Sequence, residues 1–255
     1  MNEVATAICA AIGGWWISTG IVLYLNKLPA RSHRWSLGIA TLVLLASLVG
    51  LHAGRDDTST TGALLAFTQA MLVWAWVEMS YFMGLVTGPR REPCPTDANG
   101  WLRFRLALDT SLHHELLVVA MAAVVAAITW QGSNPVGAWT FTALWLMRWS
   151  AKLNLFLGVP NVNLEWFPRR MDYLGSYIAR RSMNLLFPIS TGAGTVAATI
   201  CALHAQLAQD PWQQVAYALL ATLLALGTLE HWFMVLPLRD SALWRWALNA
   251  AASRK

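Results

Sequence analysis

The feature that most constrains this fold is a series of seven apolar runs, each about 20 residues long. Roughly 20 helical residues cross a hydrocarbon core of about 30 Å, and a helix satisfies its own backbone hydrogen bonds there. Because the connections are short, the sequence predicts one domain, an all-α polytopic membrane helix bundle. The predicted spans are Val4–Leu25, Trp35–Ala53, Thr61–Val86, Ser111–Trp130, Ala138–Gly158, Met183–Leu207 and Gln214–Leu238.

Composition supports a membrane protein. Of the 255 residues, 56% are hydrophobic and only 12% are charged, which excludes an ordinary soluble domain. Many of the 15 tryptophans lie near span ends, as in the aromatic belts of membrane interfaces. Cys9, Cys94 and Cys201 show neither metal-ligand spacing nor a disulfide framework.

The basic residues predict the orientation. Of the 18 Lys and Arg residues, 15 fall in the first, third and fifth connections and in the C-terminal tail. The positive-inside rule therefore places the N-terminus outside and the C-terminus in the cytoplasm, as seven spans require. The same rule explains the net charge of +5, so nucleic-acid binding is not expected. Glu3 precedes the first run and basic residues follow it, the reverse of a secretory signal, so we expect a retained helix. The 15 residues are Lys27, Arg31, Arg34, Arg90, Arg91, Arg103, Arg105, Arg169, Arg170, Arg180, Arg181, Arg239, Arg245, Arg254 and Lys255.

Two cytoplasmic segments predict interfacial helices, at about 169–182 and 241–251. The first spaces Met171, Leu174 and Ile178 helically beside paired arginines, and basic amphipathic helices of this kind lie on anionic membrane surfaces. A solvated basic face that merely obeys the topology accounts for the same pattern. The second segment places Leu243, Trp246, Ala247 and Ala250 on one face.

Polar side chains within the spans gather in the cytoplasmic half of the membrane. A bilayer disfavours ionisable groups, so those inside a span are functional candidates. The densest group is Leu112-His113-His114-Glu115, at the start of the fourth span. The others in this leaflet are Glu78, Arg148, Lys152, Asn154, Asn184, Glu230 and His231.

The gathering has three interpretations. In the first, the carboxylates Glu78, Glu115 and Glu230 pair with Arg148, Lys152 and the histidines and hold the helices together.

The second interpretation is a metal site, since carboxylate and imidazole ligands from different helices build di-iron centres. Consecutive helical residues lie 100° apart, so His113, His114 and Glu115 cannot all face one point. The Glu-x-x-His pair typical of such centres is also absent. The predicted ligands are Glu78, His114, Glu115, Glu230 and His231.

The third interpretation is a pocket for a tetrapyrrole such as bacteriochlorophyll, or for a carotenoid. A neutral imidazole would ligate the central Mg of the tetrapyrrole, and tryptophans would pack on its ring. The residues predicted to bind this cofactor are His113, His114, Lys152 and Asn154.

Five sequence blocks resemble the photosynthetic complex assembly proteins of the PuhE type, which are encoded beside the reaction-centre H-subunit genes of purple and related phototrophic bacteria. The blocks are 78–95 (EMSYFMGLVTGPRREPCP), 112–116 (LHHEL), 148–161 (RWSAKLNLFLGVPN), 181–188 (RSMNLLFP) and 229–246 (LEHWFMVLPLRDSALWRW).

The resemblance implies a protein of the bacterial inner membrane, in its intracytoplasmic (chromatophore) part. It implies a role in assembling the reaction centre–light-harvesting complex or in supplying its pigment. The expected partners are the reaction-centre and light-harvesting subunits, membrane lipids and a pigment. The alternative function is a metal-dependent membrane oxidoreductase, of the carboxylate–histidine type, that acts on a pigment or its precursor.

Overall fold

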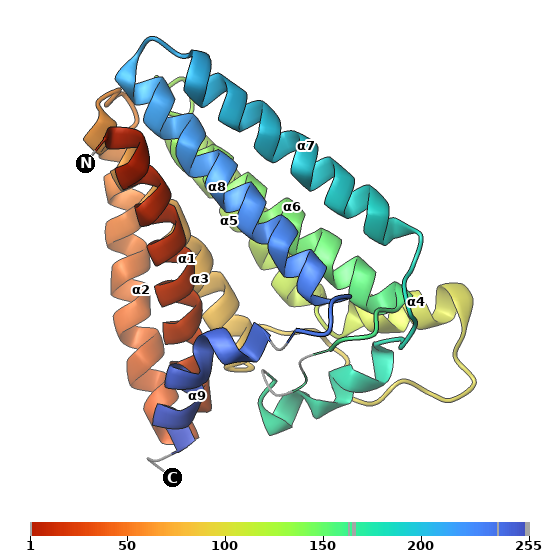
Figure 1. Cartoon of the computed structure of the whole chain (residues 1–255). Coiled ribbons are helices and arrows are strands. Elements are labelled where there is room, and N and C mark those ends of the chain that lie inside the picture. Colours follow the sequence, from red (N-terminus) through yellow and green to blue (C-terminus); the bar gives the residue numbers. More distant parts are fainter. Residues whose placement is uncertain (1, 163, 165–166, 239, 253–255) are drawn as a thin grey trace.

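The computed structural model describes residues 2–162, 164, 167–238 and 240–252, and all regular structure among them is helical (Figure 1). The α-helices are α1 (Glu3–Lys27), α2 (Ala30–Ala53), α3 (Thr60–Phe82), α4 (Gly100–Asp109), α5 (Leu112–Ile128), α6 (Val136–Leu157), α7 (Leu186–Leu207), α8 (Pro211–Phe233) and α9 (Arg245–Ala252); η2 (Arg169–Tyr177) and η3 (Asp240–Trp244) are 3₁₀ helices. Arg239, Arg254 and Lys255 of the predicted basic tail lie outside the described residues.

Each of the seven predicted apolar runs contains one long helix, and most ends differ from the prediction by a few residues. The helix in the third run ends four residues before the predicted Val86. Gly84, with a φ of 70°, stops α3 after Phe82. Arg170 donates a hydrogen bond of 2.8 Å to the carbonyl of Phe82, which satisfies one terminal carbonyl of α3.

Five helices, α1, α2, α3, α7 and α8, are long and apolar enough to cross a membrane. A sixth candidate is the pair α4 and α5, which bends by 65° between them. α6 is long enough but is not among the candidates, and its Arg148 and Lys152 make it less apolar than its neighbours. By length and composition, the described residues therefore support five or six spans, not the predicted seven.

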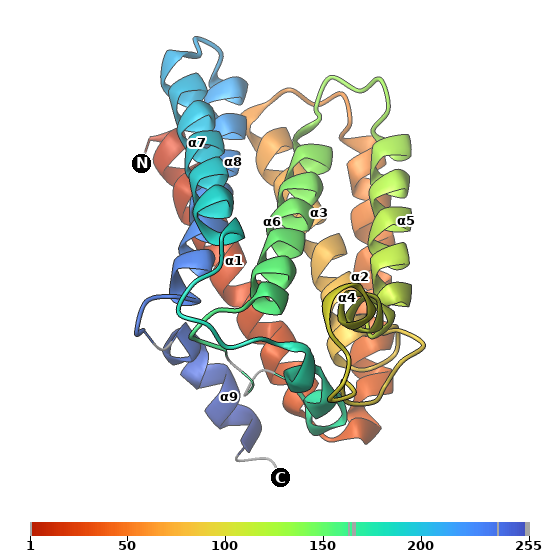
Figure 2. The ribbon, with the colours of Figure 1, turned by 90° about the vertical axis from the view of Figure 1, so that its right-hand side faces the viewer.

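α6 packs against α3, α5, α7 and α8 (Figure 2). These neighbours cover part of it: six of its 22 residues are buried, whereas Leu146 and Trp149 are exposed. α7 and α8 form a closely packed pair, α1 lies against α3 and α8, and α2 covers α3. The polar residues of α6 are thus held by protein on several sides.

The two ends of the bundle differ in structure. At one end short loops contact each other, with the Asn134 N–H bonded to the carbonyl of Arg55 at 2.7 Å. The opposite end carries α4, η2 and α9, and it includes the C-terminal end of the described chain, whereas the N-terminus lies at the first end (Figure 1).

The peripheral segments of this second end depart from the prediction. The segment predicted as an interfacial helix at 169–182 forms 3₁₀ helix only over Arg169–Tyr177. Its Met171 and Leu174 pack into a cluster with Phe82 and other residues of α3, so this apolar face covers protein. The sequence also did not predict α4.

The C-terminal segment docks on α1. Trp244, which lay outside the predicted apolar face, is fully buried, whereas Trp246 of that face is 44% exposed. The indole N–H of Trp244 donates to the carbonyl of Trp16 at 2.9 Å, and the indole N–H of Trp16 donates to the carbonyl of Leu243 at 2.9 Å. These reciprocal bonds attach the C-terminal segment to the middle of α1.

Candidate functional site

The predicted site residues come from four helices at one end of the bundle. α3, α6 and α8 end there and α5 begins there, so side chains far apart in sequence approach one another. The residues are Glu78 on α3; His113, His114 and Glu115 on α5; Lys152 and Asn154 on α6; and Glu230 and His231 on α8.

Glu78 forms the central ion pair of this region. Its Oε2 lies 3.0 Å from Nη2 of Arg148, and its Oε1 lies 3.8 Å from Nε2 of His114. The Glu78 Oε1, Arg148 Nε and His114 Nδ1 atoms are buried and have no hydrogen-bond partner among the described residues. Three unused polar atoms therefore remain around one ion pair.

The two adjacent histidines have different environments. His114 is buried, whereas His113 is exposed on the outer side of α5. The imidazole of His114 lies on the ring of Tyr81 with 4.5 Å between centroids, and its backbone N–H donates to the carbonyl of Thr87 at 2.8 Å. Only His114 can take part in the internal site.

Glu115 belongs to a second, saturated ion pair. Its Oε1 accepts from Lys152 Nζ at 2.5 Å and its Oε2 accepts from the Trp149 indole at 2.6 Å. Ser111 adds a longer bond of 3.4 Å to Oε1. This carboxylate is thus compensated by a charge and by two further donors, as a buried carboxylate requires.

Glu230 and His231 point to different neighbours although they are adjacent in sequence. Glu230 Oε1 accepts a hydrogen bond of 2.7 Å from the Trp15 indole of α1. His231 is buried, with Nε2 at 2.9 Å from Ser150 Oγ and Nδ1 at 2.8 Å from the Gly227 carbonyl. His231 therefore joins α8 to α6, and Glu230 joins α8 to α1.

Asn154 is fully buried and links helices. Its side-chain amide donates to the Ser150 carbonyl at 2.9 Å and to Ser190 Oγ at 3.0 Å. The neighbouring Asn184 donates to the carbonyls of Asn154 and Gly158 and accepts from the first backbone N–H groups of α7. These amides join the end of α6 to the start of α7.

Of the five predicted metal ligands, Glu78 and His114 approach each other. Glu115, Glu230 and His231 each contact other groups. Among the described residues, no group of three or more His, Cys, Asp or Glu side chains is placed to hold a metal ion. Arg148 and Lys152 are the cations beside Glu78 and Glu115. The prediction of a metal site stays a prediction, and the structure does not assemble its ligands into one cluster.

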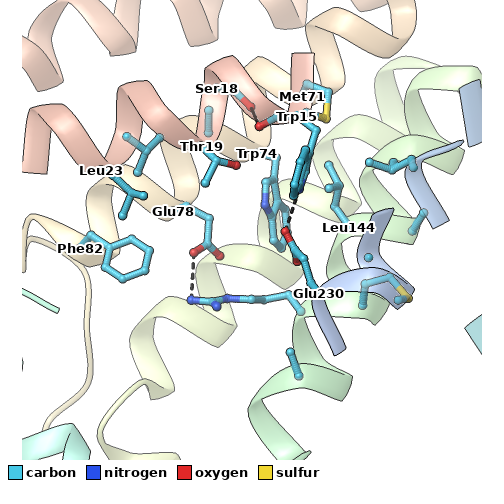
Figure 3. Close-up of a pocket in the computed structure, with 18 residues that line it drawn as sticks. Trp15, Ser18, Thr19, Leu23, Met71, Trp74, Glu78, Phe82, Leu144 and Glu230 are labelled. Atoms are coloured by element: carbon cyan, nitrogen blue, oxygen red, sulfur yellow. Dashed lines mark hydrogen bonds and ion pairs between the residues drawn. The ribbon is translucent and has the colours of Figure 1, made fainter. Parts of the chain in front are cut away.

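A cavity of about 170 Å³, here called cavity 1, lies between α1, α3, α6 and α8. The carboxylates of Glu78 and Glu230 approach it from two sides (Figure 3). Trp15, Trp74 and Leu144 contribute to its largely apolar walls. The sequence did not single out Trp15, which reaches the site from the first helix.

A second cavity of about 160 Å³, here called cavity 2, lies between α4, α5, α6 and η2. Glu115, Trp149 and Lys152 form its polar wall, and the remaining walls are mainly aromatic and aliphatic. Arg148 lines both cavities, so its side chain lies at the boundary between them. Two largely apolar cavities thus share one partly buried guanidinium.

Comparison with known proteins identifies relatives along the whole chain. The family model described as "Protein of unknown function (DUF3623)" matches residues 1–255. A protein of Rhodobacter capsulatus, described as an uncharacterized 30.4 kDa protein in the puhA 5' region, is 38% identical over 252 residues, which cover 97% of this chain and 92% of that protein. No solved structure gave a match. The chain therefore belongs to the DUF3623 family.

Proposed function

We propose that this protein is an assembly factor for the bacterial photosynthetic reaction centre–light-harvesting complex in the photosynthetic inner membrane. The observation that carries the proposal is the relative described by its position beside puhA, which is similar along almost the entire chain. The resemblance to PuhE-type assembly proteins favours the same role. The proposed partners are reaction-centre and light-harvesting subunits.

Cavity 1 suits one edge of a pigment better than a partner helix. A helix with its side chains is about 10–12 Å wide, and cavity 1, of about 170 Å³, is bounded by four helices already and is smaller than a site that encloses a whole pigment. Its apolar walls can receive a ring edge or a substituent of a pigment whose remainder lies outside the cavity. The Nε of Arg148, which has no hydrogen-bond partner among the described residues, can donate a hydrogen bond to a carbonyl oxygen there. Partner helices would then bind at the outer, lipid-facing surfaces.

We also propose the finer topology of seven spans, with the N-terminus outside and the C-terminus in the cytoplasm. Arg148 and Lys152 lower the hydropathy of α6, but each is paired with a carboxylate of α3 or α5. Inside a membrane their charges would therefore be compensated by protein. The 15 basic residues of the connections support the orientation.

Cysteine labelling tests the topology. Cys94 lies in the connection between α3 and α4, and the exposed Thr58 lies in the connection between α2 and α3. In intact cells a membrane-impermeant maleimide should label Thr58→Cys when Cys9, Cys94 and Cys201 are all changed to Ser, and should leave Cys94 unlabelled when Cys9→Ser and Cys201→Ser make it the single cysteine. Labelling of Cys94 alone would reverse the orientation, and labelling of both would contradict the span count.

Complementation tests the function. In a phototrophic strain from which the gene has been deleted, the wild-type gene should restore the near-infrared absorption of the assembled complex. Leu144→Trp fills cavity 1 and should fail to restore it at equal protein level. Leu146 lies on the same helix and is 62% exposed, so Leu146→Trp is the matched control and should restore the absorption. Normal complex in the deletion strain would refute the proposal.

A further inference from the structure

None of the ten residues of α4 is buried in the protein, although half of them are large and apolar. Trp101 is 76% exposed, whereas Phe104, Ala107 and Leu108 line cavity 2. One side of α4 thus faces the surroundings and the other faces an unfilled apolar space.

The edge of cavity 2 is basic. Arg103 Nη2 donates to the carbonyl of Tyr177 at 2.6 Å and to that of Phe156 at 3.5 Å, and both residues line the cavity. Its guanidinium also lies 4.5 Å from the centroid of the Phe156 ring. Arg90 Nε donates to the Tyr177 hydroxyl at 2.6 Å. Arg103 and Arg90 thus both contact Tyr177, one at its backbone carbonyl and the other at its hydroxyl.

Little negative charge compensates these two arginines. Among the described residues, Arg103 has no ion pair, and Arg90 lies 3.7 Å from Glu92, whose side chain is 77% exposed. An exposed pair at this distance contributes little. The edge of this apolar cavity thus carries more positive than negative charge. It lies at the end of the bundle that carries α4, η2 and α9.

We propose that cavity 2 binds a segment of one acyl chain of an anionic phospholipid, with the phosphate held by Arg103 and Arg90. A guanidinium matches phosphate oxygens by paired N–H donors, and basic pockets between helices at the cytoplasmic side bind anionic head groups. The chain lies against Phe104, Leu108 and Phe156, which completes the packing of α4. The inference uses a different cavity from the proposed pigment site, so either can fail alone.

Native mass spectrometry of the full-length protein with defined lipids tests this site. The probes are phosphatidylglycerol and phosphatidylcholine with identical acyl chains. We expect the wild type to retain phosphatidylglycerol at least about five-fold better, which corresponds to part of one charge-assisted hydrogen bond. Equal retention of the two lipids by the wild type would by itself overturn the proposal.

Two pairs of variants locate the lipid. Arg103→Gln should weaken phosphatidylglycerol retention about ten-fold, whereas Arg105→Gln, an exposed position on the same helix, should change it less than about two-fold. Leu108→Trp fills cavity 2 and should displace both lipids, whereas Leu102→Trp, at a position 52% exposed, should retain them. Equal losses within either pair would place the lipid elsewhere and overturn the assignment.

Discussion

Arg148 Nη2 lies 3.0 Å from Glu78 Oε2, at the boundary between cavity 1 and cavity 2. The pair joins α6 to α3, and it allows two ionised groups to remain within the bundle. Arg148 also has a buried Nε atom without a partner among the described residues. The same residue therefore combines a structural contact with an unused donor.

Breaking this pair should be costly from either side. Glu78→Gln and Arg148→Gln each leave a partly buried charge without its partner, and we expect each to lower the thermal midpoint in detergent. The double variant should recover part of the loss, with a coupling free energy of about 1–3 kcal/mol. Additive losses in the thermal denaturation of all three variants would show that the pair contributes nothing.

The two adjacent histidines should respond differently to the same change. His114→Ala removes a buried ring packed on Tyr81, and we expect a loss of about 2–4 kcal/mol in the free energy of unfolding. His113→Ala changes an exposed side chain and should alter stability by less than about 0.5 kcal/mol. Reversible denaturant titration of the protein in detergent measures both, and a larger loss for His113→Ala would contradict the described orientation of α5.

Asn184 should be important for joining α6 to α7. Its side chain makes four hydrogen bonds, two as donor to carbonyls at the end of α6 and two as acceptor at the start of α7. Asn184→Ala strands these buried groups and should cost about 2–4 kcal/mol in the free energy of unfolding. Ser182→Ala, in the same connection but exposed, is the control, and its thermal midpoint should remain that of the wild type.

Docking of α9 should depend on Gly20. A β-carbon at Gly20 would meet the Trp246 ring, whereas one at Gly13 would meet nothing within 4 Å. Gly20→Ala should therefore expose the C-terminal segment to limited proteolysis. Gly13→Ala should be neutral or stabilise α1 by about 0.5–1 kcal/mol. Equal proteolysis of the two variants would show that α9 does not need this contact.

The length of the apolar runs predicted the seven long helices, because these runs are separated by charged or turn residues. The gathering of polar residues at one end of the bundle also followed from the sequence. These residues lie near the ends of some spans and near the starts of others, and alternating span directions bring those ends and starts to the same side. Neither argument could show which side chains of a helix face the interior of the bundle and which face outward. His113 and His114 are equivalent in sequence, and only the packing of α5 on Tyr81 distinguishes them.

The sequence proposed that carboxylates pair with Arg148 and Lys152, and the structure shows the pairs Glu78–Arg148 and Glu115–Lys152. The sequence could not provide the uncharged partners of the site residues. Glu230 bonds to Trp15, which is 215 positions away, and periodicity carries no information on such pairs. The sequence analysis also did not predict α4, a helix of ten residues of which none is buried. Met171 and Leu174 gave a correct amphipathic signal, but it marked contact with α3 and not with a membrane.

The most direct test of the central claim is to purify the tagged protein from phototrophic membranes and to record its near-infrared and visible absorption beside mass spectrometry of co-purified subunits. The proposal predicts that the wild type and Leu146→Trp retain pigment together with reaction-centre or light-harvesting subunits, and that Leu144→Trp loses the pigment. Pigment and subunits at the level of an untagged strain, or equal pigment in Leu144→Trp, would contradict the claim that cavity 1 serves assembly of the photosynthetic complex.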